Sequence, residues 1–103
     1  LENIGDTRNI VIKKGYVPDT FAGLEQERFA FVLLDLDLYK PTVAGLEFFY
    51  PRLVSGGYLA VHDYNNPESN QACKRSVDTF MKDKPEHIIE LADRFGTVIL
   101  RKL

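Results

Sequence analysis

The most prominent pattern in the sequence is an apolar run at residues 29–36, which is interrupted by the acidic Asp35 and followed by Asp37. Strands that are apolar at consecutive positions are typical of the centre of a parallel sheet, where both faces are buried. A second apolar run, residues 58–61, also leads directly into polar residues. The pattern therefore predicts two buried strands that carry polar side chains at their C-terminal ends.

Proline, glycine and helical spacing predict the elements around these two strands. Pro41 suits the first turn of a helix, because its fixed φ fits and its missing N–H is not needed there. Pro51 is expected to kink that helix, and Gly56 with Gly57 is expected to end it. The predicted strands are residues 9–13, 29–36, 58–61, 87–91 and 97–100, and the predicted helices are residues 20–27, 41–54 and 69–82.

The last two predicted strands are separated only by residues 92–96. A parallel crossover needs a dozen or more residues, so these strands must form an antiparallel hairpin. The preceding elements alternate between strand and helix, which predicts a parallel sheet with helices on both faces. The predicted fold class is therefore a Rossmann-like α/β sheet of parallel strands with a C-terminal antiparallel β-hairpin.

The composition is that of an ordinary globular domain, with 103 residues, 45% of them hydrophobic and 27% charged. The net charge of -2 offers no basic excess for binding nucleic acid or an anionic membrane surface. No apolar run is long enough to span a bilayer. The one cysteine, Cys73, cannot form an internal disulfide, so it fits a reducing, cytoplasmic compartment and is expected to pack in the core.

The polar side chains at the two strand ends are candidates for a metal-dependent site. Asp35 and Asp37 follow one strand, His62 and Asp63 follow the next, and strands joined by one crossover are usually neighbours. Open α/β sheets bind ligands at this edge. Carboxylates there could share a divalent cation such as Mg²⁺, which would lower the pKa of a substrate hydroxyl. A carboxylate or His62 would then accept the proton.

Each of these residues also has a purely structural interpretation. Asp35 and Asp63 could accept backbone hydrogen bonds in their loops, and Asp37 is more typical of a helix cap or loop residue than of a ligand. His62 could be a hydrogen-bonded structural histidine. The residues by themselves leave both interpretations open.

Several short motifs together resemble the macrocin O-methyltransferase (TylF-like) family of class I methyltransferases. A C-terminal antiparallel hairpin is also the arrangement associated with methyltransferases that use S-adenosylmethionine, although that is an analogy of fold. The similarity begins near residues 14–21. The motifs that carry it are DLDLYKPT at residues 35–42, FYPRLVSGGY at 49–58, HDY at 62–64 and CKRSVDTF at 73–80.

The resemblance implies methyl transfer from S-adenosylmethionine to a hydroxyl of a small molecule, often a sugar. It implies a divalent metal, expected to be Mg²⁺, at Asp35, His62 and Asp63, with Asp35 and His62 as catalytic residues. It also implies that Gly15 and Tyr16 bind the adenine of the cofactor. The family commonly has Asp at the position of His62, and imidazole suits Mn²⁺, Fe²⁺ or Zn²⁺ better than Mg²⁺.

The resemblance further implies that residues 1–103 are the C-terminal portion of a single methyltransferase domain. The glycine-rich part of the cofactor site is then absent, so this chain alone is expected to be inactive. The strand at residues 29–36 would also lack a neighbour on one side. Exposed apolar edges pair with other chains, so we expect a homo-oligomer formed through this edge, or an edge that residues 9–13 cover.

Three other functions are consistent with parts of the sequence. A haloacid-dehalogenase-like phosphatase and a glycosyltransferase that binds nucleotide sugars both use a D-x-D motif with a metal. Leu38 to Lys40 fit the phosphatase turn poorly, and the terminal hairpin argues against the glycosyltransferase. The third alternative is a non-catalytic remnant or interaction module. The partner predicted for the complete enzyme is a small-molecule hydroxyl acceptor, with no nucleic acid and no membrane.

Overall fold

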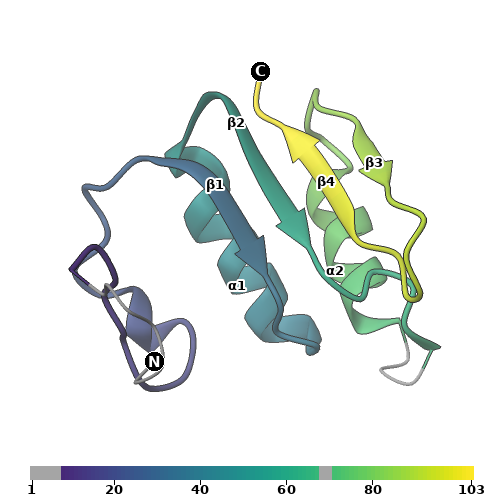
Figure 1. The fold of residues 1–103 in the computed structure, drawn as a ribbon. Helices are drawn as coiled ribbons and strands as arrows, with labels where there is room; N and C mark the ends of the chain where they lie inside the picture. Colours follow the sequence, from purple (N-terminus) through teal and green to yellow (C-terminus); the bar gives the residue numbers. More distant parts are fainter. Residues whose placement is uncertain (1–7, 68–70) are drawn as a thin grey trace.

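The computed structural model describes residues 8–67 and 71–103, and the strands in this part of the chain form one sheet in the order β1-β2-β4-β3. The two α-helices lie together on one face of the sheet (Figure 1). The strands are β1 (Phe29–Leu34), β2 (Leu53–Val61), β3 (Ile88–Glu90) and β4 (Val98–Arg101). The helices are α1 (Tyr39–Phe49), α2 (Ala72–Met81) and the short 3-10 helices η1 (Asp19–Phe21) and η2 (Tyr50–Arg52).

The sheet combines parallel and antiparallel pairing around β2. Strands β1 and β2 run parallel, with Leu34 opposite Val61 at their C-terminal ends. Strand β4 pairs antiparallel with both β2 and β3. The predicted fold class, an α/β sheet of parallel strands with a C-terminal antiparallel hairpin, is confirmed, with β1 and β2 as the parallel strands among the described residues.

The helix-covered face of the sheet carries the hydrophobic core. Helix α1 comes very close to β1, because a Cβ at Gly45 would lie 2.9 Å from Leu34 Cδ2. Cys73 of α2 is fully buried, as expected for a packing residue. The core cluster consists of Val32, Leu34, Leu46, Leu53, Leu59, Val61, Tyr64, Cys73, Val77, Val98 and Leu100.

The predicted helix over residues 41–54 is too long. Helix α1 ends at Phe49, and η2 contains Pro51, which lacks the N–H that an α-helix would need there. Gly56 and Gly57 lie inside β2, so the prediction that they end the helix is wrong. They accommodate a bulge: the register between β1 and β2 shifts there, Gly56 has φ +83°, and a Cβ at Gly57 would lie 2.9 Å from Val54 O.

The predicted strand at residues 9–13 and the predicted helix at residues 20–27 are both wrong. Residues 10–14 have no regular structure, and Val11 is 84% exposed, because no strand among the described residues pairs with this segment. Only η1 forms in the second region. Phe21 of η1 packs against Phe48 and Phe49 of α1, with ring centroids 4.8 and 4.9 Å apart.

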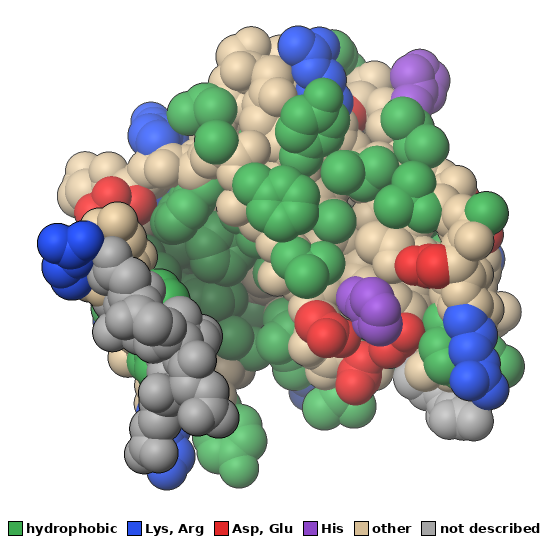
Figure 2. Space-filling view, viewed as in Figure 1, with side chains coloured by type: hydrophobic (Ala, Val, Ile, Leu, Met, Phe, Trp, Pro, Cys, Tyr) green, Lys and Arg blue, Asp and Glu red, His purple; other side chains and the backbone are tan. Residues whose placement is uncertain are grey.

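The opposite face of the sheet is open, so the prediction of α-helices on both faces is wrong for the described residues. Figure 2 views this face and shows a group of apolar side chains at its centre. Four large exposed residues belong to it, namely Phe31, Leu33, Tyr58 and Ile89. Strand β1 is also the edge of the sheet, which agrees with the expected lack of a neighbour on one side. Whether a second chain pairs there stays a prediction.

Helix α2 matches the predicted helix at residues 69–82 over most of its length. Residues 69 and 70 of that prediction lie outside the described residues. Among the described residues, no helix has the length and apolar character needed to cross a membrane.

Candidate functional site

The two strand ends predicted to carry chemistry lie side by side. Asp35 directly follows β1, and His62 and Asp63 directly follow β2. The backbone N–H of His62 donates a hydrogen bond to Leu34 O at 2.9 Å, which continues the parallel pairing beyond the last residue of β2. The side chains therefore reach one place because the ladder holds both backbones in register.

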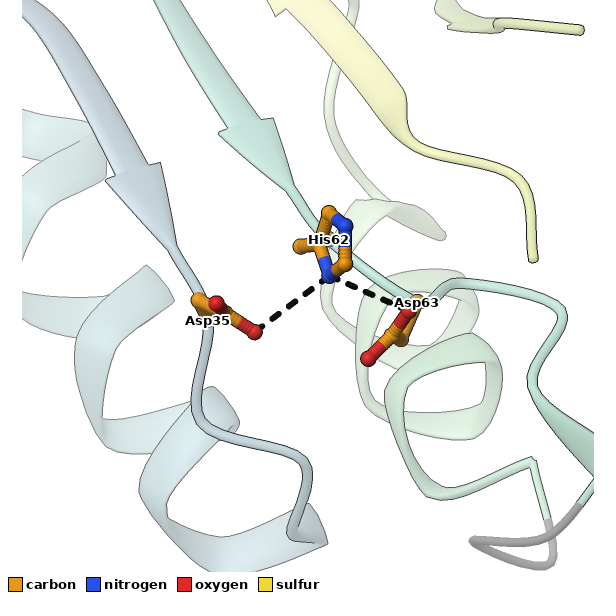
Figure 3. Close-up of side chains that lie close together, drawn as sticks. All are labelled: Asp35, His62 and Asp63. Atoms are coloured by element: carbon orange, nitrogen blue, oxygen red, sulfur yellow. Dashed lines mark ion pairs between the residues drawn. The ribbon is translucent and has the colours of Figure 1, made fainter. Parts of the chain in front are cut away.

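The three side chains converge on a small volume (Figure 3). Nδ1 of His62 lies 3.3 Å from Asp35 Oδ1 and 3.0 Å from Asp63 Oδ1. One ligand atom from each residue lies within 4.8 Å of the others, as a shared metal ion would require. The structure thus brings together the three residues that the resemblance assigned to a metal.

The loop after β2 is held from both sides. Tyr64 N–H donates to Gly96 O at 2.7 Å, and Asn65 N–H donates to Phe95 O at 2.6 Å. The Tyr64 ring is buried in the core, and its hydroxyl donates to Asp78 of α2. Asp63 adopts φ +60°, which turns its side chain within this fixed loop. Tyr64 therefore packs in the core and anchors this loop.

Two polar atoms of the cluster are buried without a hydrogen-bond partner. Nδ1 of His62 and Oδ1 of Asp63 are both shielded from solvent, and neither makes a hydrogen bond of acceptable geometry. Buried polar atoms are rarely left unpaired, because each costs about 1–3 kcal/mol. A cation between them would satisfy both atoms, so the residues present fit a divalent metal ion.

Electrostatics couple the residues of the cluster. Burial works against a charged His62, yet the charges of Asp63, Asp35 and Asp93 raise its pKa above the ordinary value. Burial raises the pKa of Asp63, the charge of His62 opposes this, and the neighbouring carboxylate of Asp37 adds to the rise. The cluster is therefore a concentration of negative charge around one imidazole, which favours binding of a cation.

Asp37 has features of both interpretations, the structural one and the functional one. It is a loop residue just before α1 with φ +62°, as the structural interpretation expects. Its carboxyl group also interacts with Asp63, so it belongs to the surroundings of the site. The D-x-D spacing is the sequence signal for this second role.

Gly15 and Tyr16, predicted to bind the cofactor, lie in a separate place. They line a cavity of about 530 Å³ together with Lys13, Lys14 and Thr20. Gly15 has φ +144°, and a Cβ there would lie 3.0 Å from Thr20 Cγ2, so a larger residue would be strained. None of the residues that line this cavity belongs to the Asp35, His62 and Asp63 cluster.

The fold is the one found in solved α/β O-methyltransferases. The chain is similar to the solved O-methyltransferase NovP, with a TM-score of 0.64 at 31% sequence identity, over 74% of this chain and 30% of that one. It is also similar to CalS11, a TDP-rhamnose 3'-O-methyltransferase of calicheamicin biosynthesis. There the TM-score is 0.65 at 29% identity, over 82% of this chain and 36% of that one.

Within that class, the chain belongs to the macrocin-O-methyltransferase (TylF) family, whose model matches residues 5–100. It is 36% identical over 66 residues to the 8-demethyl-8-(2,3-dimethoxy-alpha-L-rhamnosyl)-tetracenomycin-C 4'-O-methyltransferase of Streptomyces olivaceus. It is 34% identical over 85 residues to the mycinamicin III 3''-O-methyltransferase of Micromonospora griseorubida.

The two alignments cover 64% and 80% of this chain but only 24% and 31% of the respective relatives. The chain thus spans about a quarter to a third of their length. The recognition of the family from its motifs is confirmed.

Proposed function

We propose that this chain is part of an enzyme that transfers a methyl group from S-adenosylmethionine to a hydroxyl of a sugar or another small molecule. In this proposal Asp35, His62 and Asp63 hold a divalent cation. The family supports the transfer of a methyl group to oxygen. Among the relatives, one is named for a rhamnosyl-bearing substrate and one for TDP-rhamnose, which supports a sugar acceptor.

The observation that carries the metal part is the pair of orphaned atoms in the cluster. His62 Nδ1 and Asp63 Oδ1 face each other at 3.0 Å, shielded from solvent, with Asp35 beside them. Mg²⁺ is the cation expected from carboxylate ligands, and the imidazole raises the affinity for Mn²⁺, Fe²⁺ or Zn²⁺. A bound cation would polarise the acceptor hydroxyl and lower its pKa.

The residues have distinct roles in this mechanism. When bound, S-adenosylmethionine would supply the methyl group, and the acceptor hydroxyl would have to lose its proton to a group of this chain. Asp35 is half exposed at the end of β1, so it can both bind the cation and face the acceptor. A carboxylate of the cluster accepts the hydroxyl proton, or His62 does so where it is not a ligand. Gly15 and Tyr16 bind the adenine in their cavity.

The proposal is tested with Asp35→Asn in the full-length protein. We expect turnover to fall about 100-fold or more, because Asn neither binds a hard cation well nor accepts a proton. Binding of S-adenosylmethionine, measured by titration calorimetry, should be retained. Asp83→Asn is the matched control, because Asp83 is exposed and paired with Lys84 outside the cluster.

Three results would count against the proposal. Unchanged turnover in Asp35→Asn would remove that residue from the mechanism. A full-length protein that fails to bind S-adenosylmethionine would contradict the methyltransferase function. Hydrolysis of a generic aryl phosphate would favour the phosphatase instead.

We also propose that the 103-residue chain has no turnover by itself. It spans about a third of its solved relatives, and the cavity at Gly15 and Tyr16 is separate from the acidic cluster. Methyl transfer by the isolated chain would contradict this.

A further inference from the structure

The loop that carries Asp63 holds an uncommon backbone conformation. Asp63 has φ +60°, in the left-handed region that residues other than glycine rarely adopt. In this conformation its side chain is largely buried, and Asp63 Oδ1 lies 3.0 Å from His62 Nδ1 (Figure 3). A residue persists in such a region only where the surrounding structure holds it there. The loop therefore needs contacts that keep Asp63 directed at His62.

Tyr64, the next residue, supplies such contacts through helix α2. Its side chain is buried in the core, with Tyr64 only 3% exposed. Its hydroxyl donates a hydrogen bond to Asp78 Oδ1 and accepts one from Lys74 Nζ at 3.2 Å. Lys74 and Asp78 lie one helical turn apart and form an ion pair, with Nζ 3.4 Å from Oδ2. The hydroxyl is thus held by two side chains of one helix.

The peptide group between Asp63 and Tyr64 is restrained as well. Tyr64 N–H donates to Gly96 O at 2.7 Å, and the Asp63 carbonyl oxygen accepts from Asn66 N–H at 3.2 Å. Tyr64 is therefore held at its backbone by the connection before β4 and at its hydroxyl by α2. A residue fixed at both ends limits how far the adjacent Asp63 can turn.

We propose that Tyr64 is a positioning residue for the metal site, and that Asp78 and Lys74 anchor its hydroxyl so that the Asp63 carboxylate stays directed at His62. This inference rests on the metal site of the proposed function and adds to it a helix that supplies no ligand. In this role Tyr64 contacts neither the cation nor the substrate, because it acts through the backbone of Asp63.

The competing interpretation is that Tyr64 only adds stability to the core. Tyr64→Phe keeps the buried ring and removes the hydroxyl, so it tests the anchor directly. Leu100→Ala is the matched control for lost stability, because Leu100 is buried in the same core cluster as Tyr64. Asp78→Ala and Asp78→Asn form a second pair, because only the Asn amide oxygen can still accept the hydrogen bond from the Tyr64 hydroxyl.

The experiment measures the Mn²⁺ affinity of the full-length protein by titration calorimetry, at a temperature at which circular dichroism shows every variant to be folded. We expect Tyr64→Phe and Asp78→Ala each to weaken Mn²⁺ binding about 10-fold, because Asp63 then no longer holds its position as a ligand. Asp78→Asn and Leu100→Ala should stay within about 3-fold of the wild type. Leu100→Ala should nevertheless lower the midpoint of thermal unfolding more than Tyr64→Phe does, because it leaves a cavity in the core.

The possible outcomes separate this inference from the proposed function. If the wild type binds Mn²⁺ and Tyr64→Phe binds it equally well, the inference alone is overturned. A loss of affinity as large in Leu100→Ala would also overturn it, because lost core stability would then be the cause. Asp78→Asn as weak as Asp78→Ala would overturn it too, because the charge of Asp78 and not its hydrogen bond with Tyr64 would then set the affinity. Wild-type protein that binds no Mn²⁺ would overturn both the metal site and the positioning role.

Discussion

The two faces of the sheet have the same apolar character and very different burial. Leu34 faces the helices and is 5% exposed, whereas Leu33, its neighbour in β1, is 54% exposed on the open face. Phe31 and Tyr58, opposite each other in the register of β1 and β2, are also exposed there. Apolar residues on one face of a strand indicate that this face is suited to burial. The face is buried only where a second layer of structure packs against it.

The open face and the candidate site adjoin each other. Figure 2 shows a histidine and acidic side chains next to the apolar group on this face. The cluster of Asp35, His62 and Asp63 follows the ends of β1 and β2. The helix-covered face supplies the packing that holds β1 and β2 in register, and the strand ends then present the functional side chains. The packing on one face of the sheet thus supports the candidate site at the strand ends.

The largest effect is expected from a matched pair of substitutions on the two faces. Leu34→Ala should cost about 2–5 kcal/mol of unfolding free energy, because it leaves a cavity beneath α1. Leu33→Ala should cost less than about 1 kcal/mol in the 103-residue chain, because its side chain is already half in water. Denaturant unfolding followed by circular dichroism measures both values. Equal losses would show that the open face is covered.

The polar contacts of the helix side give the next largest effect. Tyr50 donates a hydrogen bond to Glu86, which is buried and also accepts one from the backbone N–H of Leu103 at 3.2 Å. Tyr50→Phe should destabilise the protein by about 1–3 kcal/mol, since a buried carboxylate loses one of its partners. Thermal unfolding checks this value. Tyr58→Phe on the open face is the control and should be close to neutral.

A smaller effect, on the pH dependence of the unfolding free energy, should also distinguish the helix-covered side of the sheet from the open face. The pKa of Glu86 is lowered although burial opposes this, because Tyr50, Leu103 N–H and Lys102 favour the carboxylate. Its stabilising contribution is therefore present above its unfolded pKa and is lost as the pH falls through its lower folded pKa. Glu86→Gln should flatten the acid limb of a plot of unfolding free energy against pH. An unchanged slope would contradict the role of Glu86.

The smallest change in stability, with a clear change in association, is expected on the open face. Phe31→Lys should alter the unfolding free energy by about 0.5 kcal/mol or less at this half-exposed edge position. It should nevertheless reduce self-association of the 103-residue chain, because charged residues discourage pairing of sheet edges. Sedimentation velocity over a range of concentrations measures this. A wild-type chain that stays monomeric throughout would contradict the predicted homo-oligomer.

The sequence correctly predicted the elements that find their packing partners within this chain. Strands β1 and β2, the C-terminal hairpin and the amphipathic α2 follow from periodicity and connection length. The segment at residues 9–13 was predicted wrongly, since β-branched residues form a strand only where another strand can pair with them. The bulge at Gly56 and Gly57 was also missed, because a glycine pair signals a helix end as readily as a strand irregularity.

The site shows the same division between local pattern and tertiary structure. The sequence by itself determined that Asp35, His62 and Asp63 lie at strand ends, because apolar runs end where the polar residues begin. Only the tertiary structure decided that His62 Nδ1 faces both carboxylates and that Asp63 is turned inward with φ +60°. It also brought the end of β2 next to the start of β4, because their antiparallel pairing joins residues that no sequence spacing relates.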